Sequence, residues 1–241
     1  YLLLLIFAPS SLKTMEWRML KLLNRDRKRH GLKPVRMQQD LRLVARKHSK
    51  DMAEKDYFDH VNLRAQSHVD RLKVQGITDV VSGENLAKIG GYRNPTQIAE
   101  IGLMNSPGHR ANILNSVYNT VGIGVVQSEQ KVYYFTQNFA KRDLIFLTTI
   151  PSSIRVHKKA RFKGYAFTSV KKVLYQIKES GTQNVVEEKV IGLSNHLFEC
   201  ALLFKTTGFF DVSFYIYKEG SQNFALTNEF KVRVKRGLFI F

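Results

Sequence analysis

Apolar residues near the start of the chain recur every three or four positions, the spacing found on the buried side of an amphipathic helix. The pattern predicts a first helix over residues 14–30, with Trp17, Leu20 and Leu23 on its apolar side. Basic residues crowd the last turn of this segment and Gly31 follows it, as expected at a helix C-terminus.

A second amphipathic helix is predicted to begin near Gln38. Its apolar face comprises Leu41, Val44, Ala45, His48 and Met52. Because His48 lies on this stripe, we interpret it as a hydrogen-bonded histidine of the core and not as a ligand.

Shorter helices are predicted next, and two of them open on a polar cap followed by proline. One is expected over residues 67–74, and Asn94-Pro95 opens another that ends near Asn105. Ser106-Pro107 repeats the cap and the proline, which places His109 in the first turn of a short helix. The positive end of a helix dipole favours the neutral imidazole at that position.

Alternating apolar and polar residues predict strands in two places. Residues 120–126 and 132–137 flank a polar turn and are interpreted as an antiparallel hairpin, which makes this part of the chain a mixed α and β domain. After about Pro151 the chain changes to short strand-like runs separated by polar turns. These runs cover residues 156–165, 170–178, 185–191, 197–204, 209–217 and 224–234. Their number and spacing predict an all-β sandwich of the immunoglobulin or fibronectin type over residues 151–241.

The last two runs along the chain show the clearest alternation. Phe210, Val212, Phe214 and Ile216 share one face, and Phe230, Val232 and Val234 alternate with Lys231, Arg233 and Lys235. Tyr215 and Tyr217 fall opposite the apolar face, where they act as good strand formers or as part of a binding surface. We prefer the first interpretation.

The chain begins with an apolar run, residues 2–7, followed by small residues. This is typical of the hydrophobic part of a secretion signal, so residues 1–13 are interpreted as its remnant and the protein is expected outside the cell or in the cell envelope. The run is too short for a transmembrane helix. A single cysteine, Cys200, excludes an internal disulfide framework, and its apolar surroundings predict a small buried side chain.

Charge separates this chain from an average globular protein. It carries 38 Lys and Arg against 20 Asp and Glu, a formal net charge of +18. Both parts of the chain are basic, which suits an anionic polymer or acidic lipid as partner, although a lysine-rich background composition explains it equally well. No motif for specific nucleic-acid binding or for cradling phosphate is present.

Three short segments each place one ionisable side chain beside glycine, proline or small polar residues, as in loops and helix starts. The side chains are His60, Glu84 and His109. Two imidazoles and one carboxylate are what a divalent metal, or a general acid and base, requires. Glu84 has a structural interpretation as well, as a carboxylate that caps backbone amides or pairs with an arginine.

Seven segments between residues 16 and 141 occur in the order typical of one known family. They are residues 22–25 with 31–34, 45–52, 57–60, 83–87, 105–114, 121–124 and 133–139. Through them the chain resembles the bacterial branch of the CAP superfamily, which comprises cysteine-rich secretory, antigen 5 and pathogenesis-related 1 proteins. The resemblance implies an α+β fold, a three-layer α/β/α sandwich over residues 14–145, and it ends before the predicted β-sandwich.

The resemblance also implies a site of two histidines and two glutamates. His60, Glu84 and His109 match three of the four, whereas Ser106 stands where the second glutamate is expected. The loop at residues 61–66 and Leu103, at a position usually held by tryptophan, depart from the family too. Since Ser106 is expected to cap a helix and no aspartate partner can be nominated, a Ser–His hydrolase is disfavoured.

Two hypotheses for function follow. In the first, a secreted or surface-exposed protein binds a lipid, glycan or peptide in a cleft formed by His60, Glu84, Ser106 and His109. In the second, His60 and His109 bind zinc or another divalent cation and Glu84 activates water as the catalytic residue of a hydrolase. The sequence leaves open whether the protein is an enzyme, and the missing second carboxylate ranks the hydrolase second.

Overall fold

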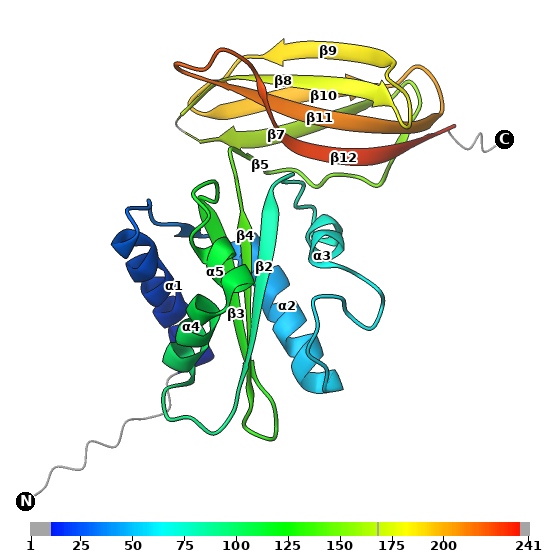
Figure 1. Ribbon diagram of the computed structural model, residues 1–241. Coiled ribbons are helices and arrows are strands. Elements are labelled where there is room, and N and C mark those ends of the chain that lie inside the picture. The colour runs from blue at the N-terminus through cyan, green and yellow to red at the C-terminus, as the bar shows by residue number, and fades with distance from the viewer. Residues whose placement is uncertain (1–10, 168, 237–241) are drawn as a thin grey trace, which may run out of the picture. The chain divides into compact units, whose positions relative to one another are not determined.

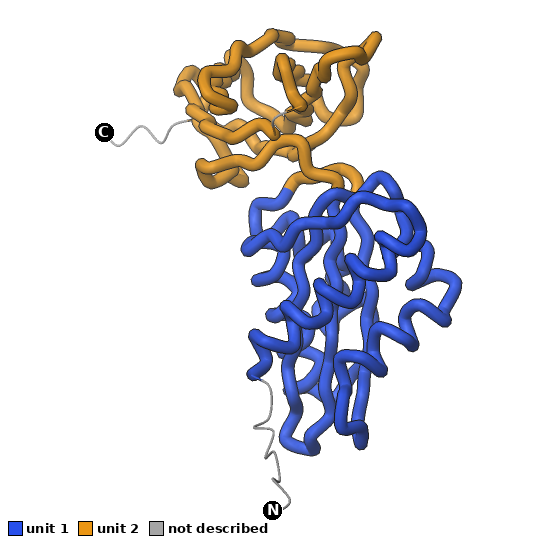
Figure 2. The backbone as a smooth tube through the Cα atoms, turned by 90° about the vertical axis from the view of Figure 1, so that its left-hand side faces the viewer, with its two compact units in different colours: residues 1–77, 82–140 blue, residues 78–81, 141–241 orange. Residues whose placement is uncertain are grey.

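The computed structural model describes residues 11–167 and 169–236. The chain forms two compact units, one comprising residues 1–77 and 82–140 and the other residues 78–81 and 141–241 (Figure 2). Residues 1–10, which carry the apolar run of the predicted secretion signal, lie outside the described part of the chain.

A four-stranded sheet forms the centre of the first unit. Its order is β1 (Arg36–Met37), β3 (Thr120–Gln127), β4 (Tyr133–Ala140) and β2 (Ser82–Ile89). The predicted hairpin is confirmed, since β3 and β4 pair antiparallel, and only β1 runs parallel to its neighbour. β2 was not predicted as a strand, and it pairs with β4 at one edge of the sheet.

Helices cover both faces of this sheet (Figure 1). They are α1 (Leu12–Arg29), α2 (Gln39–Lys55), α3 (His68–Val74), α4 (Pro95–Asn105) and α5 (Pro107–Ile113). One core joins Met19 of α1, Leu103 of α4 and Ile113 of α5 to Ile123 and Phe139 of the sheet. Smaller clusters lie under α2. The predicted mixed α and β fold is therefore confirmed for this unit.

Two glycines set the distance between α2 and the sheet. A Cβ atom on Gly122 would lie 2.1 Å from the carbonyl carbon of Leu41, and one on Gly124 would lie 2.3 Å from the backbone nitrogen of Arg46. The alternate strand positions 121, 123 and 125 carry branched side chains that are buried in the opposite core. Glycine on one side of β3 thus lets the backbone of α2 lie directly on the strand.

The predicted apolar side of α1 is wrong in one respect. Trp17 is 44% exposed, and the buried apolar positions are Met15, Met19 and Leu23. The buried face also takes in Glu16, which accepts hydrogen bonds from Arg42 and Arg46 of α2. This ion-paired carboxylate occupies part of the stripe, and Trp17 instead lies at its edge, 5.6 Å from the Arg42 guanidinium.

The described residues of the second unit form strands in two sheets. One has the order β10–β7–β5 and the other β6–β12–β11–β8–β9. The strands are β5 (Leu144–Phe146), β6 (Ser153–Arg155), β7 (Lys159–Ala166), β8 (Val170–Glu179), β9 (Val185–Ile191), β10 (Leu197–Leu203), β11 (Gly208–Lys218) and β12 (Ala225–Lys235).

Aromatic side chains of both sheets share the core of this unit. Phe146 and Phe214 meet edge to face with ring centroids 5.0 Å apart, and Phe162 packs against Phe230 at 5.8 Å. The predicted alternation is confirmed on β11 and β12, whose apolar faces are buried. Cys200 is only partly buried at the margin of this core, and burial raises the pKa of its thiol to about 12.

A short segment between α3 and β2 belongs to the second unit. Asp79 forms an antiparallel bridge with Asn228 of β12, and the Val80 N–H donates to the Thr227 carbonyl at 3.1 Å. The Asp79 carboxylate accepts a 2.8 Å hydrogen bond from Arg142, and both side chains are almost fully buried. Nothing in the sequence pattern assigned residues 78–81 to this unit.

Candidate functional site

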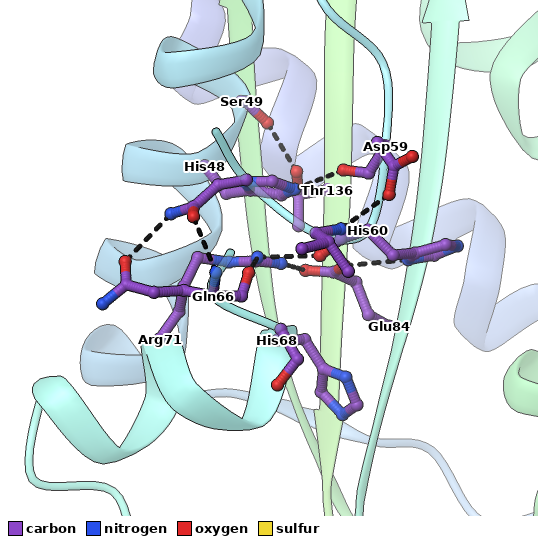
Figure 3. A network of polar contacts seen from close by, with 12 residues as sticks. His48, Ser49, Asp59, His60, Gln66, His68, Arg71, Glu84 and Thr136 are labelled. Atoms are coloured by element: carbon purple, nitrogen blue, oxygen red, sulfur yellow. Dashed lines mark hydrogen bonds and ion pairs between the residues drawn. The ribbon is translucent and has the colours of Figure 1, made fainter. Parts of the chain in front are cut away.

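Glu84 is the buried centre of the candidate site. It lies on β2, so its predicted position in a loop is wrong, and its side chain is 1% exposed. Its Oε1 accepts from His60 Nδ1 at 2.9 Å, and its Oε2 accepts from Arg71 Nη2 at 2.6 Å (Figure 3). The structure thus brings together two of the predicted residues, and the arginine partner considered for Glu84 is Arg71 of α3.

The negative charge of Glu84 and the positive charge of protonated His60 stabilise each other. Burial raises the pKa of Glu84, but the hydrogen bond from His60 and the charge of Arg71 outweigh burial and leave that pKa below its usual value. The hydrogen bond to Glu84 in turn raises the pKa of His60. The His60 side chain is 53% exposed, so a largely solvent-facing imidazole rests on a buried carboxylate.

Arg71 also holds the loop that carries His60. Its Nη1 donates to the carbonyl oxygens of His60 at 2.8 Å and of Gln66 at 2.9 Å. The position of Arg71 follows from the start of α3, where Ser67 and Asp70 form a reciprocal capping box. The loop that departs from the family at residues 61–66 is therefore fixed at both ends by one buried guanidinium.

Ser106 and His109 form a second contact. The His109 Nδ1 and the Ser106 Oγ are 2.9 Å apart. Ser106 is the N-cap residue of α5, as predicted, but its hydroxyl makes no capping hydrogen bond and contacts the imidazole instead. Burial lowers the pKa of His109, and the neighbouring charge of His60 lowers it further. The direction matches the expectation for His109, although burial is the main cause.

Amide side chains connect the two pairs. Asn85 Nδ2 donates to the His109 carbonyl at 3.0 Å, and Asn112 Nδ2 lies within hydrogen-bond distance of the Glu84 carbonyl and of Asn85 Oδ1. Asn85 also donates to Gln137, whose Nε2 donates to Glu100. The loop with His60 and the helix with His109 are thus both attached to β2.

The remaining histidines near the site serve different ends. His48 is 1% exposed and its Nε2 donates to the Asp59 carbonyl at 3.0 Å, which agrees with its interpretation as a core histidine. The Nε2 atom of His68 lies 3.3 Å from the Ser82 Oγ. Arg71 and His68 were missed because neither stands in a motif, whereas Asn85 and Asn112 stand in segments that carry the resemblance.

A comparison with protein-family models matches residues 20–139 to CAP, the cysteine-rich secretory protein family. The match spans nearly the whole sheet, the helices apart from the start of α1, and every residue of the site just described. Residues 20–139 belong to the CAP family. The resemblance seen in the sequence is therefore confirmed for this part of the chain.

Two Bacillus subtilis proteins are similar to the CAP domain. YkwD is 40% identical over 121 residues, and the membrane protein YlbC is 40% identical over 129 residues. These alignments cover 50% and 54% of this chain. The chain spans less than half the length of either relative, 46% of YkwD and 35% of YlbC.

Solved structures of surface and extracellular proteins are similar to this domain as well. An outer surface protein of Borrelia burgdorferi shares the fold at 18% identity, with a TM-score of 0.51, and the similarity covers 55% of this chain and 96% of that one. An extracellular SCP-domain protein of Bacillus anthracis is 31% identical, with a TM-score of 0.47, over 56% of this chain and 44% of that one. None of the described helices has the length and apolarity needed to cross a bilayer.

Few side-chain atoms of the candidate site are left to coordinate a metal. His60 and His109 each use Nδ1 in a hydrogen bond to another side chain, which leaves Nε2 of both rings for a ligand. Both Glu84 oxygens are already engaged. Among the described residues, no cluster of three or more His, Cys, Asp or Glu side chains is arranged to hold an ion.

Proposed function

We propose that the CAP domain is a binding module of a secreted or surface-exposed protein, and that its ligand occupies a cleft formed by His60, Glu84, Ser106 and His109. The observation that carries this proposal is the contrast between neighbouring imidazoles. The pKa of His60 is raised and that of His109 is lowered, so one ring favours a charged donor and the other a neutral acceptor. Such a pair suits a ligand that has both an anionic group and a hydrogen-bond donor.

A lipid, a glycan and a peptide all fit this description, so the test uses one probe of each class. We expect phosphatidylglycerol vesicles, cell-wall glycan fragments or an acidic peptide library to bind the intact protein. His60→Gln and His109→Gln should each weaken that binding at least tenfold, whereas His157→Gln, a histidine of the second unit, should not. Equal binding by all three variants would refute the cleft.

A metal-dependent hydrolase is the second candidate. It is supported by the two Nε2 atoms left over when each imidazole is oriented through Nδ1. A bound divalent cation would supply Lewis-acid chemistry, and Glu84, engaged with Arg71, would orient His60 instead of accepting a proton. Stoichiometric zinc that is lost in His60→Ala and His109→Ala would favour this candidate over the first.

For the second unit we propose a sandwich of immunoglobulin or fibronectin type, predicted over residues 151–241, that holds the protein at a cell envelope or host surface. The whole chain has a net charge of +18 and this unit is itself basic, which supports an anionic partner such as an acidic polymer or lipid. Retention on such a surface should weaken steeply with added salt, because exposed charges are screened. Salt-independent retention would argue for a specific partner.

A further inference from the structure

A cavity of about 270 Å³ lies in the first unit between α2, the loop at residues 62–66 and α3. None of the four proposed cleft residues lines it. Arg71 is shared, because its Nη atoms reach Glu84 and the loop carbonyls while its side chain also forms part of the cavity wall. We call this space the α2–α3 cavity. It is slightly smaller than sites for drug-sized ligands and suits a molecule of a few carbons.

Two buried polar atoms of the residues that line this cavity have no hydrogen-bond partner among the described residues, namely His48 Nδ1 and Arg71 Nε. The Asp59 carbonyl can only accept, so His48 must carry its proton on Nε2. Burial lowers the pKa of His48, which keeps the ring neutral and makes Nδ1 an acceptor. Arg71 Nε is a donor. Buried polar groups without a hydrogen-bond partner are uncommon in folded proteins, and a bound ligand is one way to satisfy them.

The cavity also has a surplus of positive charge. Its single carboxylate, Asp51, is already paired with Lys55 at 2.5 Å and accepts from the Tyr57 hydroxyl. Lys47 donates to an amide oxygen, that of Gln75, at 2.9 Å. The Arg64 side chain is exposed and pairs with no carboxylate of the described residues. An anion entering the cavity would therefore meet two cations that lack a counter-charge.

We propose that the α2–α3 cavity is a second ligand site, separate from the histidine cleft, and that it binds a small anionic polyol. A carboxylate or phosphate would face Lys47 and Arg64, a ligand hydroxyl would donate to His48 Nδ1, and a ligand oxygen would accept from Arg71 Nε. Val44 and Val74 supply apolar wall for the carbon backbone. This site does not depend on what the histidine cleft binds.

The test is an NMR titration of the intact protein with gluconate and with glycerol 1-phosphate, using sorbitol as an uncharged control. At least one of the two anions should produce saturable amide shifts confined to residues 44–51, 62–66 and 71–75, and sorbitol should not. The anion that binds identifies the charged group as carboxylate or phosphate. If neither anion saturates, or if the shifts fall elsewhere, the proposal is wrong.

Variants make the assignment specific. Arg64→Ala should weaken binding about tenfold through loss of one charge-assisted contact. Val74 is 76% exposed, so Val74→Trp should leave the fold intact while its indole obstructs the cavity and abolishes binding. Lys50→Ala removes an exposed cation of α2 that does not line the cavity and should bind as the original protein does. Unchanged binding by both Arg64→Ala and Val74→Trp would overturn the site.

Discussion

Glu84 is a buried acid held between two cations, and the pH range of that arrangement follows from its pKa shifts. The raised pKa of His60 gives stability that is complete below the ordinary value of 6.5 and is lost as pH rises through the folded value. The lowered pKa of Glu84 gives stability that is present above 4.5 and is lost as pH falls through its folded value. The pair is therefore most stabilising in mildly acidic solution.

Removing the charge of Glu84 tests this arrangement. Glu84→Gln leaves the Arg71 guanidinium buried without a counter-charge, so we expect the free energy of unfolding to fall by about 3–5 kcal/mol. The pKa of His60, followed by NMR, should fall towards its ordinary value. Glu54→Gln, an exposed residue of α2, should change neither quantity appreciably. An unchanged His60 titration would show that the pair is not formed in solution.

Glu100 is a second buried acid, and its pKa is shifted the opposite way. Burial, with help from the charge of Asp26, raises that pKa to about 8. Above pH 4.5 the unfolded chain releases this proton while the folded protein retains it, so stability falls as pH rises towards 8. Glu100→Gln should remove this dependence, with an effect of roughly 5 kcal/mol at most between about pH 5 and 8.

Denaturation curves at several pH values would measure the Glu100 effect. Glu129→Gln, in the exposed turn after β3, serves as the control. Parallel pH profiles for Glu100→Gln and the original protein would contradict the predicted shift. Gln137 donates to Glu100 and accepts from Asn85, so this buried acid is joined to the candidate site by hydrogen bonds.

At the scale of elements, α2 is positioned by the two glycines of β3 that face it, Gly122 and Gly124. Gly124→Ala would put a Cβ 2.3 Å from the backbone of α2, which must move away because a helix backbone cannot yield locally. We expect a loss of about 1–3 kcal/mol in unfolding free energy. Gly102→Ala, in α4, has open space around its Cβ and should be neutral or slightly stabilising. Equal stabilities of the two variants would disprove this role for Gly124.

The sequence predicted the elements of this chain better than their contacts. The helices and the β3–β4 hairpin follow from local periodicity and caps. β2 was missed because Ser82, Gly83 and Asn85 are turn formers. The Asn85 amide finds its partners far along the chain, in Gln137 and Asn112. His60, Glu84 and His109 were found through motifs, whereas Arg71 reaches Glu84 across a loop that the sequence could not place.

At the scale of the whole molecule, the second unit depends on a buried ion pair contributed by distant parts of the chain. Asp79→Ala would leave Arg142 without this carboxylate, and we expect the second unit to lose about 3–5 kcal/mol of stability. Calorimetry should show its transition at a lower temperature. Lys231→Ala, which removes an exposed partner of Asp211, should cost less than about 1 kcal/mol. An unshifted transition for Asp79→Ala would exclude the pair as a determinant of that unit.

The assignment of residues 78–81 to the second unit has a consequence for how such a protein can evolve. One edge of β12 pairs with β6 at residues 233–235 and with residues 78–80 at residues 227–229. A gene rearrangement that joined residues 141–241 to another protein at a single junction would leave residues 78–81 of the second unit behind. Exchange of residues 141–241 between genes would therefore require a second inserted segment that restores the bridge to Asn228.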